Sequence, residues 1–334
     1  MKRALSVGIN YPGTNNELRG CVNDSYMIEA LLRDNYGFED ITLLLDNDAT
    51  TANMRSALNK LVDSAVPGDV IFFHYSGHGS QMLNQRDDDD NEPDNLDEII
   101  CPVDLDWNTK VIRDDELREI FDRVPNGVNL TVFLDCCNSG GGMDHLNQYQ
   151  SLAPGERELP RNEEEGGRYL PPPAGMLEEA ASRQLQVKPR ALSRRNIDHS
   201  GLMISGCQSH QTSADAFING EYRGAATYYL NNTLLNIGFD ATYLALIDRM
   251  NKDIAANGFT QRPELNGPER LFDQWFLGDH TNLEFDGTVP ADPTPVAPTP
   301  VKDDDDDKKG NTLKIVLAVA AVAAIIYFVT QGGV

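Results

Sequence analysis

The chain has 334 residues, of which 52 are acidic and 28 are basic, so its formal net charge at pH 7 is −24. This charge should repel nucleic acid and attract cations or basic peptides, which argues against nucleic acid as a partner. The five cysteines are an odd number without paired spacing, which argues against a disulfide framework and a zinc site.

Strand-like and helix-like segments alternate along most of the chain. The alternation predicts an α/β fold with a mostly parallel sheet of about six strands, helices on both faces and functional residues at the carboxyl ends of the strands. In chain order the expected elements are strand 4–9, helix 21–33, strand 41–45, helix 51–64, strand 70–74, helix 114–123, strand 130–134, strand 201–205, helix 224–236 and helix 241–256.

Two glycine-flanked turns follow apolar, β-prone runs, and they carry the chemistry. His78 lies in the first turn and adjacent Cys136 and Cys137 lie in the second. Because neighbouring parallel strands end at one edge of a sheet, His78 and a cysteine should lie side by side. An imidazole can take the proton of a thiol and return it to a leaving amine, so the pair predicts acyl transfer by a Cys/His dyad. The backbone amides of Gly79 and Cys137 are the expected oxyanion donors.

If strand alternation persists to the end of the second run, Cys137 faces the same side as Asp135 and Cys136 faces the other. We therefore expect Cys137 to be the reactive cysteine and Cys136 to be a small packing residue.

The two turns, Tyr75 to Gly79 and Asp135 to Gly140, resemble the catalytic blocks of metacaspases, the caspase-like peptidases of organisms other than animals. The resemblance spans Met1 to about Gly278 and implies the caspase-hemoglobinase fold. It also implies that Cys137 is the nucleophile and His78 the general acid and base, with Asn138 where the family commonly has His. Four further stretches agree in family order: Val7 to Tyr11 with Leu18 to Asp24, Asp97 to Asp104, Ile112 to Leu117, and Ile204 to Cys207 with Gln211 to Ala216.

The resemblance implies a pocket for Arg or Lys before the scissile bond, lined by Asp24 and Asp135 with Ser76 nearby. A carboxylate binds guanidinium through paired, charge-assisted hydrogen bonds. We therefore expect protein or peptide substrates cut after a basic residue and not after Asp. Without the resemblance, Asp24 would be read as a helix cap and Asp135 as a strand-end cap.

Calcium is the expected cofactor, and no organic cofactor is expected. Calcium-dependent metacaspases use acidic positions that match Asp97, Asp114, Asp115 and Asp144, and all four are present. Asp114 and Asp115 could equally be the acidic first turn of a helix. The acidic run 87–98 lacks the glycine that an EF-hand loop requires, so most of it is expected to be an exposed loop.

Residues 1–282 are the expected peptidase domain. It comprises a large-subunit-like region over residues 1–141, a flexible loop over 142–200 and a small-subunit-like region over 201–282. We expect this catalytic domain to be monomeric. The loop is polar and rich in Pro, Glu and Arg, so it cannot form much core. It is either an inert basic linker or a site of self-cleavage at Lys188, Arg190, Arg194 or Arg195.

We expect residues 283–312 to form a Pro- and Asp-rich linker and residues 313–334 to form a single-pass transmembrane anchor. The alternative interpretation of residues 313–334 is a helix that is buried in an oligomer. Lys308, Lys309 and Lys314 flank its amino side, so the positive-inside tendency predicts a cytoplasmic catalytic domain.

An alternative function of a different class remains. The chain would then be an inactive caspase-like membrane scaffold whose pocket binds basic segments without cutting them. A third reading keeps the peptidase and changes its specificity to Asp or Asn.

Overall fold

Six strands form the central sheet of the computed structural model, in the order β12-β9-β7-β3-β1-β2. All neighbours in it pair in parallel except β12, which is antiparallel to β9. The expected sheet of about six mostly parallel strands is confirmed. Its strands are β1 (Lys2–Gly8), β2 (Asp40–Leu45), β3 (Val70–Ser76), β7 (Asn129–Asp135), β9 (Gly201–Ser205) and β12 (Glu264–Asn266). The structure describes residues 1–83, 96–136, 166–176, 179, 201–208 and 211–278.

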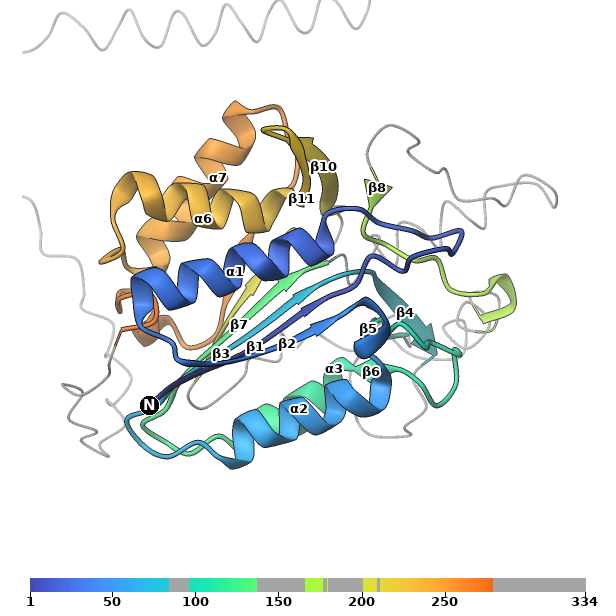
Figure 1. The fold of residues 1–334 in the computed structure, drawn as a ribbon, viewed down its shortest axis with the longest axis horizontal. Helices are drawn as coiled ribbons and strands as arrows, with labels where there is room; N and C mark the ends of the chain where they lie inside the picture. Colours follow the sequence, from blue (N-terminus) through green and yellow to red (C-terminus); the bar gives the residue numbers. More distant parts are fainter. Residues whose placement is uncertain (84–95, 137–165, 177–178, 180–200, 209–210, 279–334) are drawn as a thin grey trace, which may run out of the picture. The chain divides into compact units, whose positions relative to one another are not determined.

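Helices cover both faces of this sheet (Figure 1). Helices α1 (Cys21–Tyr36), α6 (Ala225–Ile237) and α7 (Tyr243–Ala256) lie on one face, and α2 (Thr51–Asp63) and α3 (Asp114–Phe121) lie on the other. Every residue of β3 is buried, as expected for a parallel strand covered on both sides.

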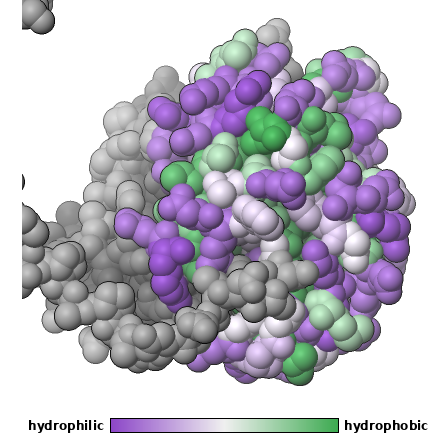
Figure 2. All heavy atoms as spheres, turned by 90° about the vertical axis from the view of Figure 1, so that its left-hand side faces the viewer, coloured by the Kyte–Doolittle hydropathy of each residue, from purple (hydrophilic) through white to green (hydrophobic). Residues whose placement is uncertain are grey.

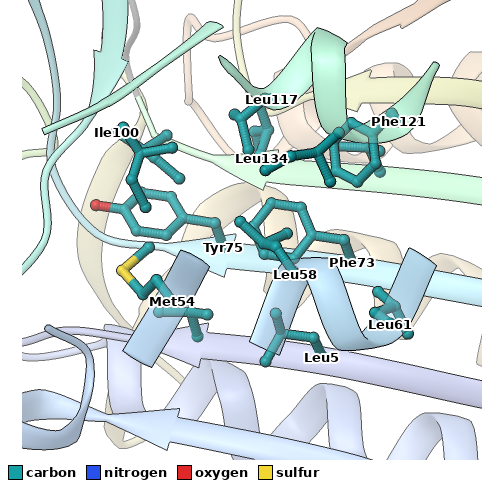
Figure 3. Close-up of a cluster of buried hydrophobic side chains, with 14 of the residues drawn as sticks. Leu5, Met54, Leu58, Leu61, Phe73, Tyr75, Ile100, Leu117, Phe121 and Leu134 are labelled. Atoms are coloured by element: carbon teal, nitrogen blue, oxygen red, sulfur yellow. The ribbon is translucent and has the colours of Figure 1, made fainter. Parts of the chain in front are cut away.

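The core is therefore two hydrophobic clusters separated by the sheet. Phe72 of β3 belongs to the cluster beneath α1, α6 and α7, whereas its neighbour Phe73 belongs to the cluster beneath α2 and α3. Figure 3 shows Phe73 in the second cluster, between Leu58 of α2 and Phe121 of α3. The alternation of strand side chains fixes which residues at the strand ends point to each face.

Two small antiparallel sheets accompany the central one. The first contains β4 (Gly79–Leu83), β5 (Leu96–Ile100) and β6 (Ile112–Arg113). The second contains β8 (Gly166–Gly167), β10 (Ala214–Ile218) and β11 (Glu221–Gly224). Because β4 follows β3 almost directly and β11 runs into α6, both sheets bring residues to the carboxyl ends of the central strands. Two short 3-10 turns, η1 (Asp46–Asp48) and η2 (Glu269–Leu271), complete the described elements.

Local signals set several helix ends. The Thr50 side chain accepts the Asn53 backbone N–H at the start of α2, and the Thr242 side chain accepts that of Ala245 at the start of α7. Helix α1 ends at Gly37, which has a left-handed φ of 69°.

Exposed large hydrophobic side chains come from separate elements, such as Tyr26 of α1, Leu235 of α6 and Leu244 of α7. On the face shown in Figure 2, hydrophobic residues are interspersed among hydrophilic ones. Single exposed apolar side chains are usual on folded proteins, so they identify no site by themselves.

The prediction of a C-terminal transmembrane helix is corrected. Among the residues that the structure describes, no helix is long and apolar enough to cross a membrane. The longest of them, α1, has 16 residues, and a crossing needs about 20 predominantly apolar ones. Segments 283–312 and 313–334 lie outside the described residues. The single-pass anchor and the cytoplasmic placement deduced from it are withdrawn.

Candidate active site

His78 lies two residues beyond the end of β3 and is almost fully buried. Its Nε2 atom is 2.8 Å from the backbone oxygen of Asn16. Because a carbonyl oxygen only accepts, Nε2 carries the hydrogen and Nδ1 keeps the lone pair of the neutral ring. Nδ1 is buried and has no hydrogen-bond partner within the described part of the chain. The ring is thus held in the tautomer that leaves Nδ1 available as a base.

The protonation state of His78 follows from its surroundings. Burial lowers its pKa to about 4, while the Asn16 carbonyl and the backbone of Arg168 oppose the shift and the Arg168 charge adds to it. The imidazole is therefore neutral at pH 7 and can accept a proton from a thiol.

The three residues predicted to bind substrate meet at the carboxyl end of the central sheet. Ser76 and Asp135 end β3 and β7 and face each other in the register of these strands. Asp24 lies in the first turn of α1 and accepts the Ser76 hydroxyl hydrogen over 2.7 Å. All three are fully buried, and β10 adds a fourth buried residue, Asp215. Hereafter Asp24, Ser76, Asp135 and Asp215 are called the acidic pocket.

The acidic pocket contains the side chain of Arg168, which is 0% exposed. Its Nη2 atom lies 2.7 Å from Asp24 Oδ2 and 3.0 Å from Asp215 Oδ1. Its Nη1 atom lies 2.8 Å from Ser76 Oγ and 3.3 Å from Asp135 Oδ2. The Nη1 and Nη2 atoms of the planar guanidinium thus contact different carboxylates. A lysine, with a single ammonium group, cannot make this arrangement of contacts.

The walls of the pocket require glycine where the guanidinium enters. A Cβ atom on Gly224 would lie 2.2 Å from Asp135 Oδ2 and 2.3 Å from Arg168 Nη1. The Gly224 N–H also donates to Asp24 Oδ1 over 2.9 Å. Asp135 is held by Thr227, whose N–H and hydroxyl both donate to Oδ2. These hydrogen bonds orient the carboxylate oxygens in the pocket.

The charge of the pocket depends on its occupant. Burial raises the pKa of Asp24 to about 6, and the Arg168 guanidinium opposes the shift while the Asp135 charge adds to it. Loss of the guanidinium would raise the pKa of Asp24 further. A cation in the pocket therefore favours the charged form of Asp24.

The backbone of Arg168 is bound as well as its side chain. Its N–H donates to the Ser213 oxygen over 3.1 Å, and its carbonyl oxygen accepts the Gly79 N–H over 2.9 Å. Gly79 is one of the two predicted oxyanion donors. On the following side, the Leu170 N–H donates to the Gly79 oxygen over 2.9 Å.

Cys136 points away from the pocket. It is buried in the cluster beneath α2 and α3, whereas Asp135 points to the opposite face. Burial raises the pKa of the Cys136 thiol, so this side chain stays protonated. Its environment fits packing and not nucleophilic attack.

Three of the four predicted calcium ligands lie on β5 and at the start of α3. Asp97 is paired with Arg113, and Asp115 with Arg118. Burial and then the charge of Asp115 raise the pKa of Asp114 to about 6. Its Oδ1 atom is buried and lacks a hydrogen-bond partner within the described ranges. That orphaned oxygen fits a hard cation. No three His, Cys, Asp or Glu residues in the described ranges form a metal-binding group, so a calcium ion would need further ligands from elsewhere.

Several predicted residues lie outside the described residues: Cys137, Asp144, Lys188, Arg190, Arg194 and Arg195. The structure therefore gives no geometry for the Cys137–His78 pair or for the predicted cleavage sites. The monomeric state also stays a prediction.

Two site residues were not predicted from the sequence. Asp215 lies within the stretch Gln211 to Ala216 that carries the resemblance, but no role was assigned to it. Arg168 lies in the sequence Gly-Gly-Arg-Tyr-Leu at 166–170, inside the polar loop. A basic residue followed by apolar ones within a polar loop was the available signal.

Comparisons with known proteins match most of this sequence. A family model described as "Metacaspase, peptidase C14 domain" matches residues 2–146. Metacaspase-1 of Candida albicans is 32% identical over 317 residues, which cover 85% of this chain and 67% of that protein. Metacaspase-7 of Arabidopsis thaliana is 44% identical over 154 residues, covering 44% of this chain and 37% of that protein.

A crystal structure of a Geobacter sulfurreducens protein has the same fold, with a TM-score of 0.59 at 24% identity over 83% of this chain and 98% of that chain. The mixed six-stranded sheet and the identity to metacaspases along most of the sequence lead to one assignment: the chain belongs to the metacaspase family and has its caspase-like α/β fold.

Proposed function

We propose that this cysteine peptidase is an endopeptidase that cuts after arginine and, less efficiently, after lysine. The observation that carries the proposal is the buried guanidinium of Arg168 between Asp24, Asp135 and Asp215. Three carboxylates would repel an aspartate side chain, so the same pocket disfavours caspase-like cleavage after Asp.

The chemistry uses Cys137 as nucleophile and His78 as general acid and base. His78 Nδ1 takes the thiol proton, and the thiolate attacks the carbonyl carbon of the arginine residue. The Gly79 N–H, which donates to a carbonyl oxygen at this position, stabilises the developing oxyanion. The imidazolium then protonates the leaving amine, and water hydrolyses the thioester to release the carboxylate and restore the thiol.

The Asn16 carbonyl is a positioning group in this mechanism. Its oxygen lies 2.8 Å from Nε2 and accepts the hydrogen there, so Nδ1 stays deprotonated in the neutral ring. It also stabilises the imidazolium that forms after proton transfer.

The test uses the full chain and three reporter peptides that differ only in Arg, Lys or Asp before the cleaved bond. We expect turnover in the order Arg, Lys, Asp, with none detectable in the Cys137→Ala variant. Thiol-independent turnover, or a preference for Asp, would refute the proposal. Binding of the Arg peptide without turnover would favour the inactive scaffold instead.

Calcium activation is a second element of the proposal. The orphaned Asp114 oxygen, close enough to Asp97 and Asp115 for their charges to raise its pKa, supports a cation there. When bound, the ion would supply positive charge that holds these loops together, with Asp144 as a further ligand. Titration calorimetry of calcium into the Cys137→Ala chain should show binding that Asp114→Asn weakens at least about tenfold.

Self-processing is the third element. The candidates Lys188, Arg190, Arg194 and Arg195 rest on sequence alone.

A further inference from the structure

We infer that Tyr11 is a positioning residue for His78, because its phenol contacts both the backbone and the ring of the general base. The inference rests on the proposed function, since the role of His78 as general acid and base comes from there. Tyr11 ends the stretch Val7 to Tyr11 that carries the family resemblance, and the sequence alone assigned it no role.

The Tyr11 hydroxyl is bound to the backbone of His78. The His78 N–H donates to the Tyr11 oxygen over 3.0 Å, and the Tyr11 hydroxyl donates to the Cys101 oxygen over 2.6 Å. Burial raises the pKa of the Tyr11 phenol, and the Cys101 thiol adds to the shift, so the hydroxyl keeps its hydrogen. Because His78 lies two residues beyond the end of β3, the phenol bonds the N–H where the strand has already ended.

A second buried phenol, that of Tyr75, supports the same residue from its other backbone group. The Tyr75 hydroxyl donates to the His78 oxygen over 2.7 Å and lies 3.0 Å from the Tyr11 hydroxyl. A Cβ atom on Gly77 would lie 2.5 Å from the Tyr75 oxygen and 3.0 Å from the Tyr11 oxygen. The turn before His78 therefore has room for both phenols because residue 77 is glycine.

The Tyr11 ring contacts the imidazole directly. The two ring centroids are 4.8 Å apart, and the ring planes are tilted by 36°. Aromatic rings at this distance attract each other, so the contact restricts rotation of the His78 side chain. The Asn16 carbonyl fixes Nε2 at the same time. With one nitrogen and one ring face held, the direction in which Nδ1 points is set.

The backbone of Tyr11 adopts a conformation that packing alone does not require. Its φ is 51°, in the left-handed region that bulky side chains rarely adopt. The Tyr11 oxygen accepts both the N–H and the hydroxyl of Thr14, which closes the turn that leads to Asn16. One loop thereby delivers both groups that contact the His78 ring. Strained residues of this kind cluster at functional sites.

A purely structural tyrosine and a positioning tyrosine predict different kinetics. Loss of a structural phenol would lower the melting temperature and leave the chemical step unchanged. Loss of a positioning phenol lowers kcat, because a reacting group displaced by about 1 Å can cost about 100-fold in rate. KM should change little, since Tyr11 is not part of the acidic pocket.

The experiment measures kcat and KM for an Arg reporter peptide with the full chain carrying Arg168→Gln, so that no arginine of the chain fills the acidic pocket. Tyr11→Leu removes the ring and the hydroxyl, so kcat should fall by about 100-fold while KM stays within about threefold. Tyr11→Phe keeps the ring contact and loses one hydroxyl, so kcat should fall by about tenfold. Tyr36→Phe is the matched control, because Tyr36 is also buried and donates to the Phe239 oxygen over 3.2 Å. The control should keep its kcat.

A second measurement needs no substrate. The rate at which iodoacetamide alkylates Cys137, followed by mass spectrometry, reports how readily the thiol loses its proton to His78. This rate should fall in Tyr11→Leu and stay unchanged in Tyr36→Phe. Melting temperatures within a few degrees of the Arg168→Gln parent check that each variant folds. If Tyr11→Leu does not fold, Tyr11→Phe decides the outcome.

Three results would overturn the inference. One is an equal loss of kcat in Tyr11→Phe and Tyr36→Phe. Another is a rise in KM with unchanged kcat in the Tyr11 variants, and the third is folded Tyr11 variants that keep the kcat of the parent. A different result would point to the proposed function instead. If the parent lacks thiol-dependent turnover and iodoacetamide alkylates Cys137 no faster than free cysteine, the proposed function itself fails.

Discussion

Asp24→Asn is the substitution that isolates the charge of the acidic pocket. Asp24 Oδ2 receives Arg168 Nη2 at 2.7 Å, while Oδ1 accepts the Gly224 N–H at 2.9 Å. An asparagine can keep its oxygen toward Gly224 and the shape of the side chain. It loses the negative charge that faces the guanidinium, so the change acts on arginine binding more than on packing.

The expected cost follows from burial. Both partners are fully buried, and loss of one member of a desolvated charged pair costs roughly 2–5 kcal/mol. Because Asp135 and Asp215 still face the guanidinium, we take about 3 kcal/mol, which corresponds to a loss of about 150-fold in kcat/KM for Arg peptides. The pKa of Asp24 adds a pH signature. Since protonation removes its charge, arginine cleavage should weaken as the pH falls through the pKa of Asp24, which burial raises to about 6 with the Arg168 guanidinium in place and which is higher without it.

The assay measures kcat/KM for an Arg reporter between pH 5 and pH 8, in the Arg168→Gln background so that the pocket is open. Asp34→Asn is the control, because Asp34 is exposed on the same helix, α1. Asp24→Asn should lose most activity at pH 8 and show a flatter profile as the pH falls toward 5. An Asp24→Asn enzyme within threefold of the control at pH 8 would refute the reasoning about the pocket.

Three further predictions concern the wall of the pocket, the core and the cation site. Gly224→Ala places a methyl group 2.3 Å from the position of Arg168 Nη1, so kcat/KM for Arg reporters should fall by about tenfold or more, measured beside the melting temperature. Burial lowers the pKa of His74 to about 3, below the roughly 6.5 of an unfolded histidine, so stability is fully present above pH 6.5 and is lost as the pH falls. Urea unfolding at pH 6.5 and pH 4.5 should show a loss of up to about 2.7 kcal/mol that His74→Gln lacks; an equal loss in both proteins would contradict this. Asp114→Asn should weaken calcium binding by calorimetry at least about tenfold, and unchanged binding would remove Asp114 from the cation site.

The central elements were predictable because their signals are local. The apolar runs of β3 and β7 predict these strands within two residues of their ends, and Thr50 marks the start of α2. The short strands β4 to β6 and β10 to β12 were not predicted. Gly79–Leu83 contains Ser80 and Gln81 in buried positions, and its strand form comes from pairing with β5. A strand that depends on tertiary pairing in this way cannot be predicted from a local sequence pattern.

The residues of the acidic pocket also differ in whether local sequence signals predict them. Ser76 and Asp135 follow from two strand ends in register, and the family resemblance added Asp24. Asp215 reaches the pocket only because β10 folds back against residues near the amino end, where it accepts the N–H groups of Arg19 and Gly20. Arg168 comes from a loop without hydrophobic periodicity, so its burial depends on charges that lie far away in sequence. Neither could be predicted from spacing.

The most direct test of the account compares two peptides that differ only in arginine or citrulline before the cleaved bond. Citrulline keeps the shape of the guanidinium and removes its charge, so the ratio of kcat/KM reports the charge recognition of Asp24, Asp135 and Asp215. With Arg168→Gln as the enzyme, the account predicts a preference for arginine of about 100-fold or more. Equal turnover of the two peptides would contradict it.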